Sequence, residues 1–379
     1  MSNWNKCLNR LVAGQDLNRL EAKWLMEQIM LGDAGHAQLG AILALLSAKT
    51  ETAEEIEGFA EGMLQHAVPF EVPGRLLDIV GTGGDQVGSV NISSMAAVVI
   101  AACGIKVLKH GNKAVSSLSG SADVLGELGV NLNLQPDGVA ATANEAGISF
   151  AFATTFHPAM RHAAPIRKEL GIHTVFNLLG PLTNPSHPDT VVIGVANVKY
   201  ARLVAEVFAS RGEEGFVFNG KDENGRGLDE LAATAHGTLF EIRQVRDADG
   251  TKRGIIEETT FDPARLRDTV GLEKIEIDDL KGGDAKHNAQ VARRLFDGVG
   301  AQPSDTKQER AIFQTVCLNA AAGIVADATL IPDGLLEHAN TFENLMERFE
   351  FGFNLAKEAI ISGKAKEKLE KWIKVSNQH

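Results

Sequence analysis

The sequence has only three cysteines, no long apolar run and fewer basic than acidic residues, and each shortage excludes a class of protein. Cys7, Cys103 and Cys317 lie far apart, and none belongs to a CxxC motif. This spacing suggests neither a disulfide framework nor a zinc site, and it fits a reducing cytoplasm. The longest apolar run, Met95 to Ile105, is well short of the roughly 18 residues that suggest a membrane span. We therefore expect a buried helix there and no membrane partner.

The charge balance and the length set two further limits. Lysine and arginine number 37 against 49 aspartates and glutamates, a net charge of -12 that repels a nucleic-acid backbone. We therefore expect no nucleic-acid partner. The 379 residues exceed one typical core of about 100–200, so two structural units are expected, with a single α/β domain carrying insertions as the alternative. The first residues lack a basic segment followed by an apolar one, so we expect no secretory signal and a cytoplasmic protein.

The pattern of apolar residues changes along the chain. Residues up to about 70 predict helices, with Leu17, Leu20, Trp24, Leu25 and Ile29 on one helix face. Thr52 and Glu55 form a predicted capping box. After these helices, short β-rich runs alternate with helical patterns, which predicts βαβ units and a mostly parallel sheet. About 60 C-terminal residues are again helical, and KAKEKLEKW is typical of a solvated helix face. The β-rich runs are LLDIV, IKVLKHG, ISFAFAT, TVVIGVAN and GFVFNG.

A glycine-rich loop follows the first predicted strand. Gly81 to Asp85, GTGGD, lies between the buried strand LLDIV and the helix that begins near NISS. Backbone N–H groups and a helix N-terminus both favour negative charge, so the loop predicts a phosphate or diphosphate site. It matches neither GxxxxGK[ST] nor GxGxxG. Asn91, Ser93 and Ser94 are otherwise explained as helix caps. Lys109 and His110 end the next strand and precede a second polar, glycine-containing loop, which places two such loops along one sheet edge.

Two pairs of acids are candidates for a metal site near this edge. Asp229 and Glu230 follow two glycines, and Asp222 and Glu223 belong to a nearby KDE. Mg²⁺ takes one or two carboxylates together with water and phosphate oxygens, and spacing alone does not choose between the pairs. Arg161 and Arg167 are candidate anion clamps, or surface arginines whose stems cover apolar groups. The histidines show no HxxxH or HExxH spacing and no Gly-x-Ser-x-Gly elbow accompanies them, which disfavours zinc and hydrolase chemistry.

Taken together, these motifs resemble the anthranilate phosphoribosyltransferase family of tryptophan biosynthesis. The matches follow the order of the family across most of the chain, and it is their number and order that make the resemblance specific. The matching pieces are GTGGD (Gly81 to Asp85), NISS (Asn91 to Ser94), KHGN (Lys109 to Asn112), SGSADVLGELG (Ser119 to Gly129), FHPAMRHAAPIRKELG (Phe156 to Gly171), FNLLGPLTNP (Phe176 to Pro185), GLDEL (Gly227 to Leu231) and LKGGDAKHNA (Leu280 to Ala289).

The resemblance implies an enzyme that transfers the 5-phosphoribosyl group of phosphoribosyl pyrophosphate to the amine of anthranilate. Its products would be N-(5-phosphoribosyl)anthranilate and diphosphate. The implied architecture is that of the nucleoside phosphorylases and class III phosphoribosyltransferases, and the implied assembly is a homodimer. A small helical domain would comprise residues 1–72 and part of about 158–188, an α/β domain would comprise residues 73–379, and the active site would lie in the cleft between them.

The resemblance also implies roles for individual residues, without a discrete catalytic acid or base. His110 is a candidate base that we expect to be non-essential, because the amine proton becomes acidic only after the C–N bond forms. Two Mg²⁺ ions per subunit would bind Ser93, Asp229 and Glu230. Anthranilate would contact Gly81, His110, Asn112 and Arg167, with Arg167 facing its carboxylate. Phosphoribosyl pyrophosphate would contact Gly81, Thr82, Gly83, Gly84, Asp85, Asn91, Ser93, Ser94 and Lys109.

The chain departs from the family pattern at several positions. Ser94 replaces a threonine, Lys113 an arginine and Thr154 a proline, and Lys113 lacks the planar fork of arginine. The stretches KDENGR and RQVRDADGTKRGI look longer than usual and adjoin the loop that carries Asp229 and Glu230. The alternatives are a pyrimidine nucleoside phosphorylase, which would need an HTGGT-type stretch where this chain has SLSGSAD, and a basic, non-catalytic relative that binds nucleic acid. A transferase acting on another aromatic amine is also left open.

Overall fold

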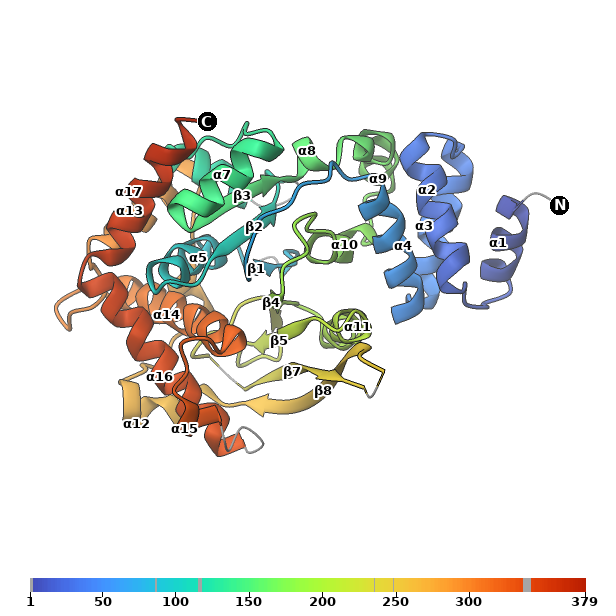
Figure 1. Ribbon diagram of the computed structural model, residues 1–379. Coiled ribbons are helices and arrows are strands. Elements are labelled where there is room, and N and C mark those ends of the chain that lie inside the picture. Colours follow the sequence, from blue (N-terminus) through green and yellow to red (C-terminus); the bar gives the residue numbers. More distant parts are fainter. Residues whose placement is uncertain (1–2, 86, 115–117, 235, 248, 337–341) are drawn as a thin grey trace.

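The computed structural model describes residues 3–379 apart from 86, 115–117, 235, 248 and 337–341. Four N-terminal helices lie together at one end of the molecule (Figure 1). Gly58 and Gly62 of the fourth helix lie against the backbone of the second, since a Cβ at these positions would come within 2.3 and 2.8 Å of backbone oxygens. The helices are α1 (Asn3–Val12), α2 (Arg19–Leu31), α3 (His36–Lys49) and α4 (Ala53–Gln65).

The predicted helical face is confirmed at three of its five positions. Leu17, Leu25 and Ile29 are buried, Trp24 is half-buried, and Leu20 is 75% exposed. The prediction for Leu20 is wrong because α2 begins at Arg19 and buries the stripe through Ala22, Leu25, Met26, Ile29 and Met30 instead. The capping box is confirmed, since Thr52 accepts from the backbone N–H of Glu55 and the Glu55 carboxylate accepts from that of Thr52.

The predicted mostly parallel sheet is confirmed. Five parallel strands take the order β3-β2-β1-β4-β5, and β7 and β8 extend the sheet as an antiparallel hairpin, while the short β6 pairs with β5. Most of the stretch around 243–255, expected as a longer loop, therefore belongs to these two strands, at residues 243–246 and 252–255. The strands are β1 (Leu77–Gly81), β2 (Val107–Gly111), β3 (Ile148–Phe152), β4 (Thr190–Gly194), β5 (Glu214–Lys221), β6 (Gly227–Leu228), β7 (Gly237–Arg246) and β8 (Lys252–Phe261).

Helices cover both faces of the sheet (Figure 1). α5 (Ile92–Ala102) and α14 (Lys307–Asp327) pack on one face and are covered in turn by α16 (Phe342–Ile361) and α17 (Lys364–Ser376). The helix predicted at Met95 to Ile105 is confirmed as α5 up to Ala102, where the helix ends. The KAKEKLEKW face is exposed on α17 apart from half-buried Lys368 and buried Ala365, Leu369 and Trp372. No helix within the described ranges has both the length and the apolar character needed to cross a membrane.

The other face joins the sheet to the N-terminal helices. α10 (Phe176–Leu182) and α11 (Val198–Ser210) pack against α4, and η1 (Pro158–His162) and α9 (Ala164–Leu170) pack against α2 and α3. One apolar core runs from α1–α4 through these segments to Val191 and Ile193 of β4. The remaining elements are α6 (Ser121–Leu128), α7 (Pro136–Ala146), α8 (Ala153–Phe156), η2 (Pro263–Leu266), α12 (Arg267–Val270), η3 (Ile277–Leu280), α13 (Ala285–Phe296) and α15 (Asp333–Leu336).

Candidate functional site

The glycine-rich loop leaves the carboxyl end of β1 at Gly81. The backbone N–H of Thr82 donates to the carbonyl of Gly194 at the end of β4, over 2.9 Å. Gly83 and Gly84 have φ of 73° and 86°, a backbone conformation that glycine adopts without strain, and a Cβ on either would meet no atom within 4 Å. Exposed backbone of this kind lets an anion approach the N–H groups closely.

Two acidic side chains accept hydrogen bonds from this loop and from the start of α5. Asp229 Oδ2 accepts from the Gly83 N–H over 2.6 Å, and Glu230 Oε1 accepts from the Ser93 N–H over 3.3 Å. Burial and the nearby Asp85 raise the pKa of Asp229 well above its usual range. Burial and the Asp229 charge likewise raise the pKa of Glu230. The structure therefore brings acidic side chains together in surroundings that disfavour the ionised forms of Asp229 and Glu230.

Glycines at the ends of neighbouring strands make room for this acidic segment. A Cβ at Gly194 would lie 1.7 Å from the Asp229 carbonyl oxygen, one at Gly81 would lie 2.6 Å from the Asp229 carboxylate, and one at Gly220 would lie 2.4 Å from the Glu230 carbonyl oxygen. Residues 227–231 thus cross the carboxyl ends of β1, β4 and β5 in direct contact with their backbones. Gly81 was named as part of the glycine-rich loop, whereas Gly194 and Gly220 were missed because they lie far from that loop in the sequence.

The other two candidate acids, Asp222 and Glu223 of KDE, lie in the turn that leads to residues 227–231. Asp222 Oδ1 accepts from the backbone N–H groups of Asn224 and Arg226, over 2.9 and 2.8 Å, and so closes the turn between β5 and β6. Glu223 pairs with Lys274. The stretch KDENGR is therefore a tight hairpin turn, and both of its acids already have partners there.

Lys109 on β2 and Asn91, the residue before α5, are two further predicted site residues. The Lys109 ammonium is fully buried and donates to the Ile79 carbonyl; burial lowers its pKa, and Asp78 and Glu230 oppose that effect. Asn91 makes no cap hydrogen bond with its side chain, so the capping interpretation is wrong for this residue. Its amide instead donates to the Ser119 carbonyl over 3.3 Å and accepts from Asn288 over 2.9 Å.

His110 lies on the opposite face of the sheet edge, against α10. Its Nδ1 donates to the Gly180 carbonyl over 3.0 Å, and its ring meets His157 edge-on at 5.2 Å. His157 Nε2 donates to the Thr183 carbonyl over 2.8 Å. Burial lowers the pKa of His110 to about 3 and that of His157 to about 4. Both rings are therefore neutral, and the other nitrogen of each is a buried acceptor with no partner among the described residues.

Arg167 and Asn112 stand apart from the acidic cluster. The Arg167 guanidinium lies 4.9 Å from the centre of the Phe176 ring, and burial lowers its pKa. Within the described part of the chain no carboxylate pairs with it. Asn112 is exposed and accepts from the Lys113 N–H over 2.8 Å, so Lys113 is anchored here by its backbone. Arg161, the alternative clamp, is exposed and donates to the Pro158 carbonyl over 3.3 Å.

The two remaining departures from the family pattern differ in environment. Ser94 is buried, and its hydroxyl has no partner in the structure. Thr154 is exposed in α8. The loop after Asn112 lies partly outside the described residues.

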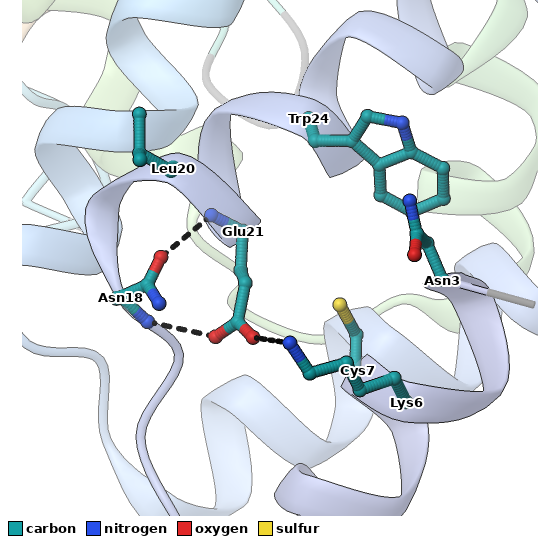
Figure 2. Close-up of a pocket in the computed structure, with 7 residues that line it drawn as sticks. All are labelled: Asn3, Lys6, Cys7, Asn18, Leu20, Glu21 and Trp24. Atoms are coloured by element: carbon teal, nitrogen blue, oxygen red, sulfur yellow. Dashed lines mark hydrogen bonds and ion pairs between the residues drawn. The ribbon is translucent and has the colours of Figure 1, made fainter.

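A surface hollow of about 360 Å³ lies elsewhere, between α1 and α2 (Figure 2). Asn18 and Glu21 form a capping box at its edge, and Lys6 pairs with Glu21 over 3.0 Å. None of its lining residues belongs to the predicted site, so it is not the candidate active site. The hollow is lined by Asn3, Lys6, Cys7, Asn18, Leu20, Glu21 and Trp24.

The acidic cluster fits a cation that phosphate helps to bind. Among the described residues no three histidine, cysteine or acidic side chains converge as a complete metal site. Mg²⁺ needs only one or two protein carboxylates when water and phosphate oxygens complete its octahedron. Asp229 and Glu230 accept from the backbone N–H groups of Gly83 and Ser93 and keep further oxygen lone pairs for such a cation.

Comparisons with known proteins agree along nearly the whole chain. Residues 5–67 match the model of the glycosyl transferase family helical bundle domain, and residues 73–366 match that of its a/b domain. Anthranilate phosphoribosyltransferase of Streptomyces griseus is 46% identical over 374 residues, which cover 99% of this chain and 95% of the relative.

Solved structures give the same result. Anthranilate phosphoribosyltransferase of Thermus thermophilus is 35% identical with a TM-score of 0.81, covering 98% of this chain and 99% of the relative. The Saccharomyces cerevisiae enzyme in complex with PRPP and Mg is 26% identical with a TM-score of 0.80, over 99% and 98% of the two chains. Its complex with 4-fluoroanthranilate is 25% identical with a TM-score of 0.79, over 100% and 99%. The chain belongs to the anthranilate phosphoribosyltransferase family.

Proposed function

We infer that the protein transfers the 5-phosphoribosyl group of phosphoribosyl pyrophosphate to the amine of anthranilate, as a step of tryptophan biosynthesis. The products are N-(5-phosphoribosyl)anthranilate and diphosphate. One observation carries the inference beyond family membership: Asp229 and Glu230 are held on the backbone N–H groups of the glycine-rich loop and of the α5 N-terminus. A diphosphate with its cations needs these two kinds of group side by side.

The diphosphate side of the site uses backbone donors and the acid pair. We propose that Ser93, Asp229 and Glu230 hold two Mg²⁺ ions per subunit, which when bound neutralise the diphosphate and make it a better leaving group. In the structure the two carboxylates accept from the Gly83 and Ser93 N–H groups. With the cations and the diphosphosugar bound, the two carboxylates would hold the cations, and the Gly83 and Ser93 N–H groups would then be free to donate to phosphate oxygens. These donors stabilise the charge that grows on the departing diphosphate.

The acceptor side supplies orientation. Arg167 has a guanidinium without a carboxylate partner in the described chain, and we propose that it binds the carboxylate of anthranilate. Gly81, His110 and Asn112 complete the proposed contacts. His110 is a poor base, because burial lowers its pKa to about 3. Catalysis therefore rests on holding the amine against ribose C1 and on excluding water, without a covalent enzyme intermediate.

The assembly and the domain division are part of the same proposal. We propose a cytoplasmic homodimer, supported by three free cysteines and by the exposed Leu20 and Leu31 of α2. The division into residues 1–72 with part of about 158–188, and residues 73–379, is supported by the packing of η1, α9 and α10 on α2, α3 and α4.

The test is to follow anthranilate fluorescence after mixing the purified protein with phosphoribosyl pyrophosphate, Mg²⁺ and anthranilate. We expect a loss of fluorescence that EDTA abolishes and that requires the diphosphosugar. No loss, from folded protein that still binds the diphosphosugar, would refute anthranilate as the acceptor and favour another aromatic amine. No binding of the diphosphosugar would refute the transferase function itself.

A further inference from the structure

A buried asparagine on α14 holds the backbone next to the acid pair. Asn319 is fully buried in the otherwise apolar stretch CLNAAAGIV. Its Oδ1 accepts from the Leu231 N–H over 3.2 Å, and its Nδ2 donates to the Leu231 carbonyl over 2.8 Å. The same Nδ2 donates over 2.8 Å to the carbonyl of Thr315, one turn earlier in the helix. The side-chain amide therefore pairs with both backbone groups of Leu231, as a neighbouring strand would.

The segment that Asn319 holds has no regular structure of its own. β6 ends at Leu228, and residues 229–234 belong to no helix or strand. Leu231, which directly follows Glu230, is buried, so its backbone groups would be left without water or partners if Asn319 were removed. Further along, the Ala233 carbonyl accepts from the Ile275 N–H over 3.1 Å. Among the described residues, Asn319 therefore makes the backbone contact that lies nearest to the acid pair on the C-terminal side of Glu230.

The strand glycines confine the same segment. The carbonyl oxygens of Asp229 and Glu230 lie against Gly194 and Gly220, where even a Cβ would come within 1.7 and 2.4 Å. The acidic backbone therefore cannot move closer to these two strands, and the paired hydrogen bonds of Asn319 hold the next residue, Leu231. Both constraints restrict the position of the carboxylates.

We propose that Asn319 is a positioning residue that sets the affinity of Asp229 and Glu230 for the divalent cation bound with the diphosphosugar. The proposal rests on the proposed function, since it assigns the cation to that acid pair. Asn319 acts through the Leu231 backbone and does not itself touch cation or substrate. Loss of an outer partner that orients metal ligands typically weakens metal binding about 10- to 100-fold.

The same helix supplies a matched control. Gln314 forms the same kind of paired contact with the backbone of Glu273, donating to its carbonyl and accepting from its N–H, each over 2.8 Å. Gln314 is also buried, at 6% exposure, but the residue it holds lies outside the acidic segment. A general loss of α14 packing would affect Asn319→Ala and Gln314→Ala alike, whereas only Asn319 holds the residue beside Glu230.

The experiment measures cation binding apart from turnover. Mn²⁺ is titrated calorimetrically into protein saturated with phosphoribosyl pyrophosphate and without anthranilate, for the unsubstituted chain, Asn319→Ala and Gln314→Ala. We expect Asn319→Ala to weaken Mn²⁺ binding about tenfold and Gln314→Ala to change it less than about twofold. In steady state, the Mg²⁺ concentration for half-maximal rate should rise by the same factor in Asn319→Ala, with little change in the anthranilate KM.

Unchanged Mn²⁺ binding in Asn319→Ala, or equal weakening in both variants, would overturn the proposal. If Asn319→Ala does not fold, Asn319→Ser replaces it, because a hydroxyl keeps one hydrogen bond to this region but cannot bridge both groups of Leu231. Failure of the unsubstituted protein to consume anthranilate, with intact Mn²⁺ binding, would count against the proposed acceptor alone and leave the role of Asn319 to be decided by the titration.

Discussion

At the scale of single residues, Glu230 is a buried acid whose ionised form is only partly stabilised by its protein neighbours. Burial and Asp229 raise its pKa, and a single backbone N–H bonds to it. We expect Glu230→Gln to lower kcat/KM on the order of 100-fold, about 2.7 kcal/mol of transition-state stabilisation, because a cation ligand is lost. Glu223→Gln is the matched control, since Glu223 pairs with Lys274 in the turn. The measurement is of initial rates at varied Mg²⁺ concentration for both variants. A Glu230→Gln variant as active as the Glu223→Gln control would contradict the assignment of the acid pair to the cation site.

Arg167 is the proposed ligand of the anthranilate carboxylate. Its guanidinium packs on Phe176 and has no carboxylate partner in the described chain, so a carboxylate ligand would supply the missing charge. We expect Arg167→Ala to raise the anthranilate KM about 10- to 100-fold, the worth of a charge-assisted hydrogen bond, with a smaller effect on the diphosphosugar KM. Arg161→Ala, at an exposed neighbour, should leave both constants unchanged. Equal effects of the two substitutions would contradict the assignment.

His110 predicts a dependence of stability on pH. Burial lowers its pKa from 6.5 to about 3, so the unfolded chain binds a proton below pH 6.5 that the folded chain does not. Its contribution to stability is complete above pH 6.5 and is lost as the pH falls toward 3, and at pH 5 the loss is about 2 kcal/mol. Urea unfolding from pH 7 to pH 5 should therefore show a shallower decline for His110→Gln than for the unsubstituted chain. Parallel declines would mean that His110 is protonated in the folded protein.

At the scale of elements, the sequence was sufficient for the strands that are buried on both faces. Runs such as TVVIGVAN predict β4 because parallel strands covered by helices on both sides are almost continuously apolar. The β7–β8 hairpin was not predicted, since its outer strand is mostly exposed and carries charged residues such as Arg253 and Glu257. Leu20 was misplaced because a periodic pattern defines an apolar face but not where the helix begins.

The candidate site was predicted in a similarly uneven way. The loop glycines and the acid pair were found because their residue types are informative at short range, and the family resemblance gave them roles. Asn319 and Asn288 reach the site through contacts with residues 88 and 197 positions away along the chain. No local pattern predicts such contacts: Asn319 was visible only as an asparagine within an apolar stretch, and Asn288 lay in the matching piece LKGGDAKHNA without a role assigned to it.

Gly194 offers a test of the element that carries the acids. A Cβ there would lie 1.7 Å from the Asp229 carbonyl oxygen, a backbone atom that can move only with the whole acidic segment. We expect Gly194→Ala to destabilise the fold by about 1–3 kcal/mol and to lower the Mg²⁺-dependent rate further than the lost stability explains. Gly40→Ala in α3, where a Cβ meets nothing within 4 Å, should be neutral or stabilising by up to about 1 kcal/mol. A Gly194→Ala variant with unchanged rate and stability would show that the segment is not held against β4.

At the scale of the whole molecule, the two expected units share apolar packing. The core of α1–α4 continues through α10 and α11 to one face of β4, while the other face carries a core of its own. Arg211, at the end of α11, bonds to Glu57 of α4 over 2.9 Å and to the Leu182 carbonyl over 2.9 Å. Motion of the helical end relative to the sheet would therefore strain a buried ion pair as well as apolar contacts. Any closure over substrate must be small or must break this connection.

The outer surface of the helical end is where the proposed homodimer is tested. Leu20 and Leu31 are 75% and 56% exposed, and with Trp24 they lie within about 40° of one another around α2, since each residue turns the helix by about 100°. Two exposed leucines beside a half-buried tryptophan form an apolar patch of the kind that is typical of a protein interface. We expect the unsubstituted protein to have twice the chain mass by light scattering, and Leu20→Glu to shift the measured mass toward that of the monomer.

Ile361→Glu, at a comparably exposed position on α16, is the control and should leave the dimer intact. A monomeric unsubstituted protein would refute the dimer, and a dimer that survives Leu20→Glu but not Ile361→Glu would place its interface at the other end of the molecule.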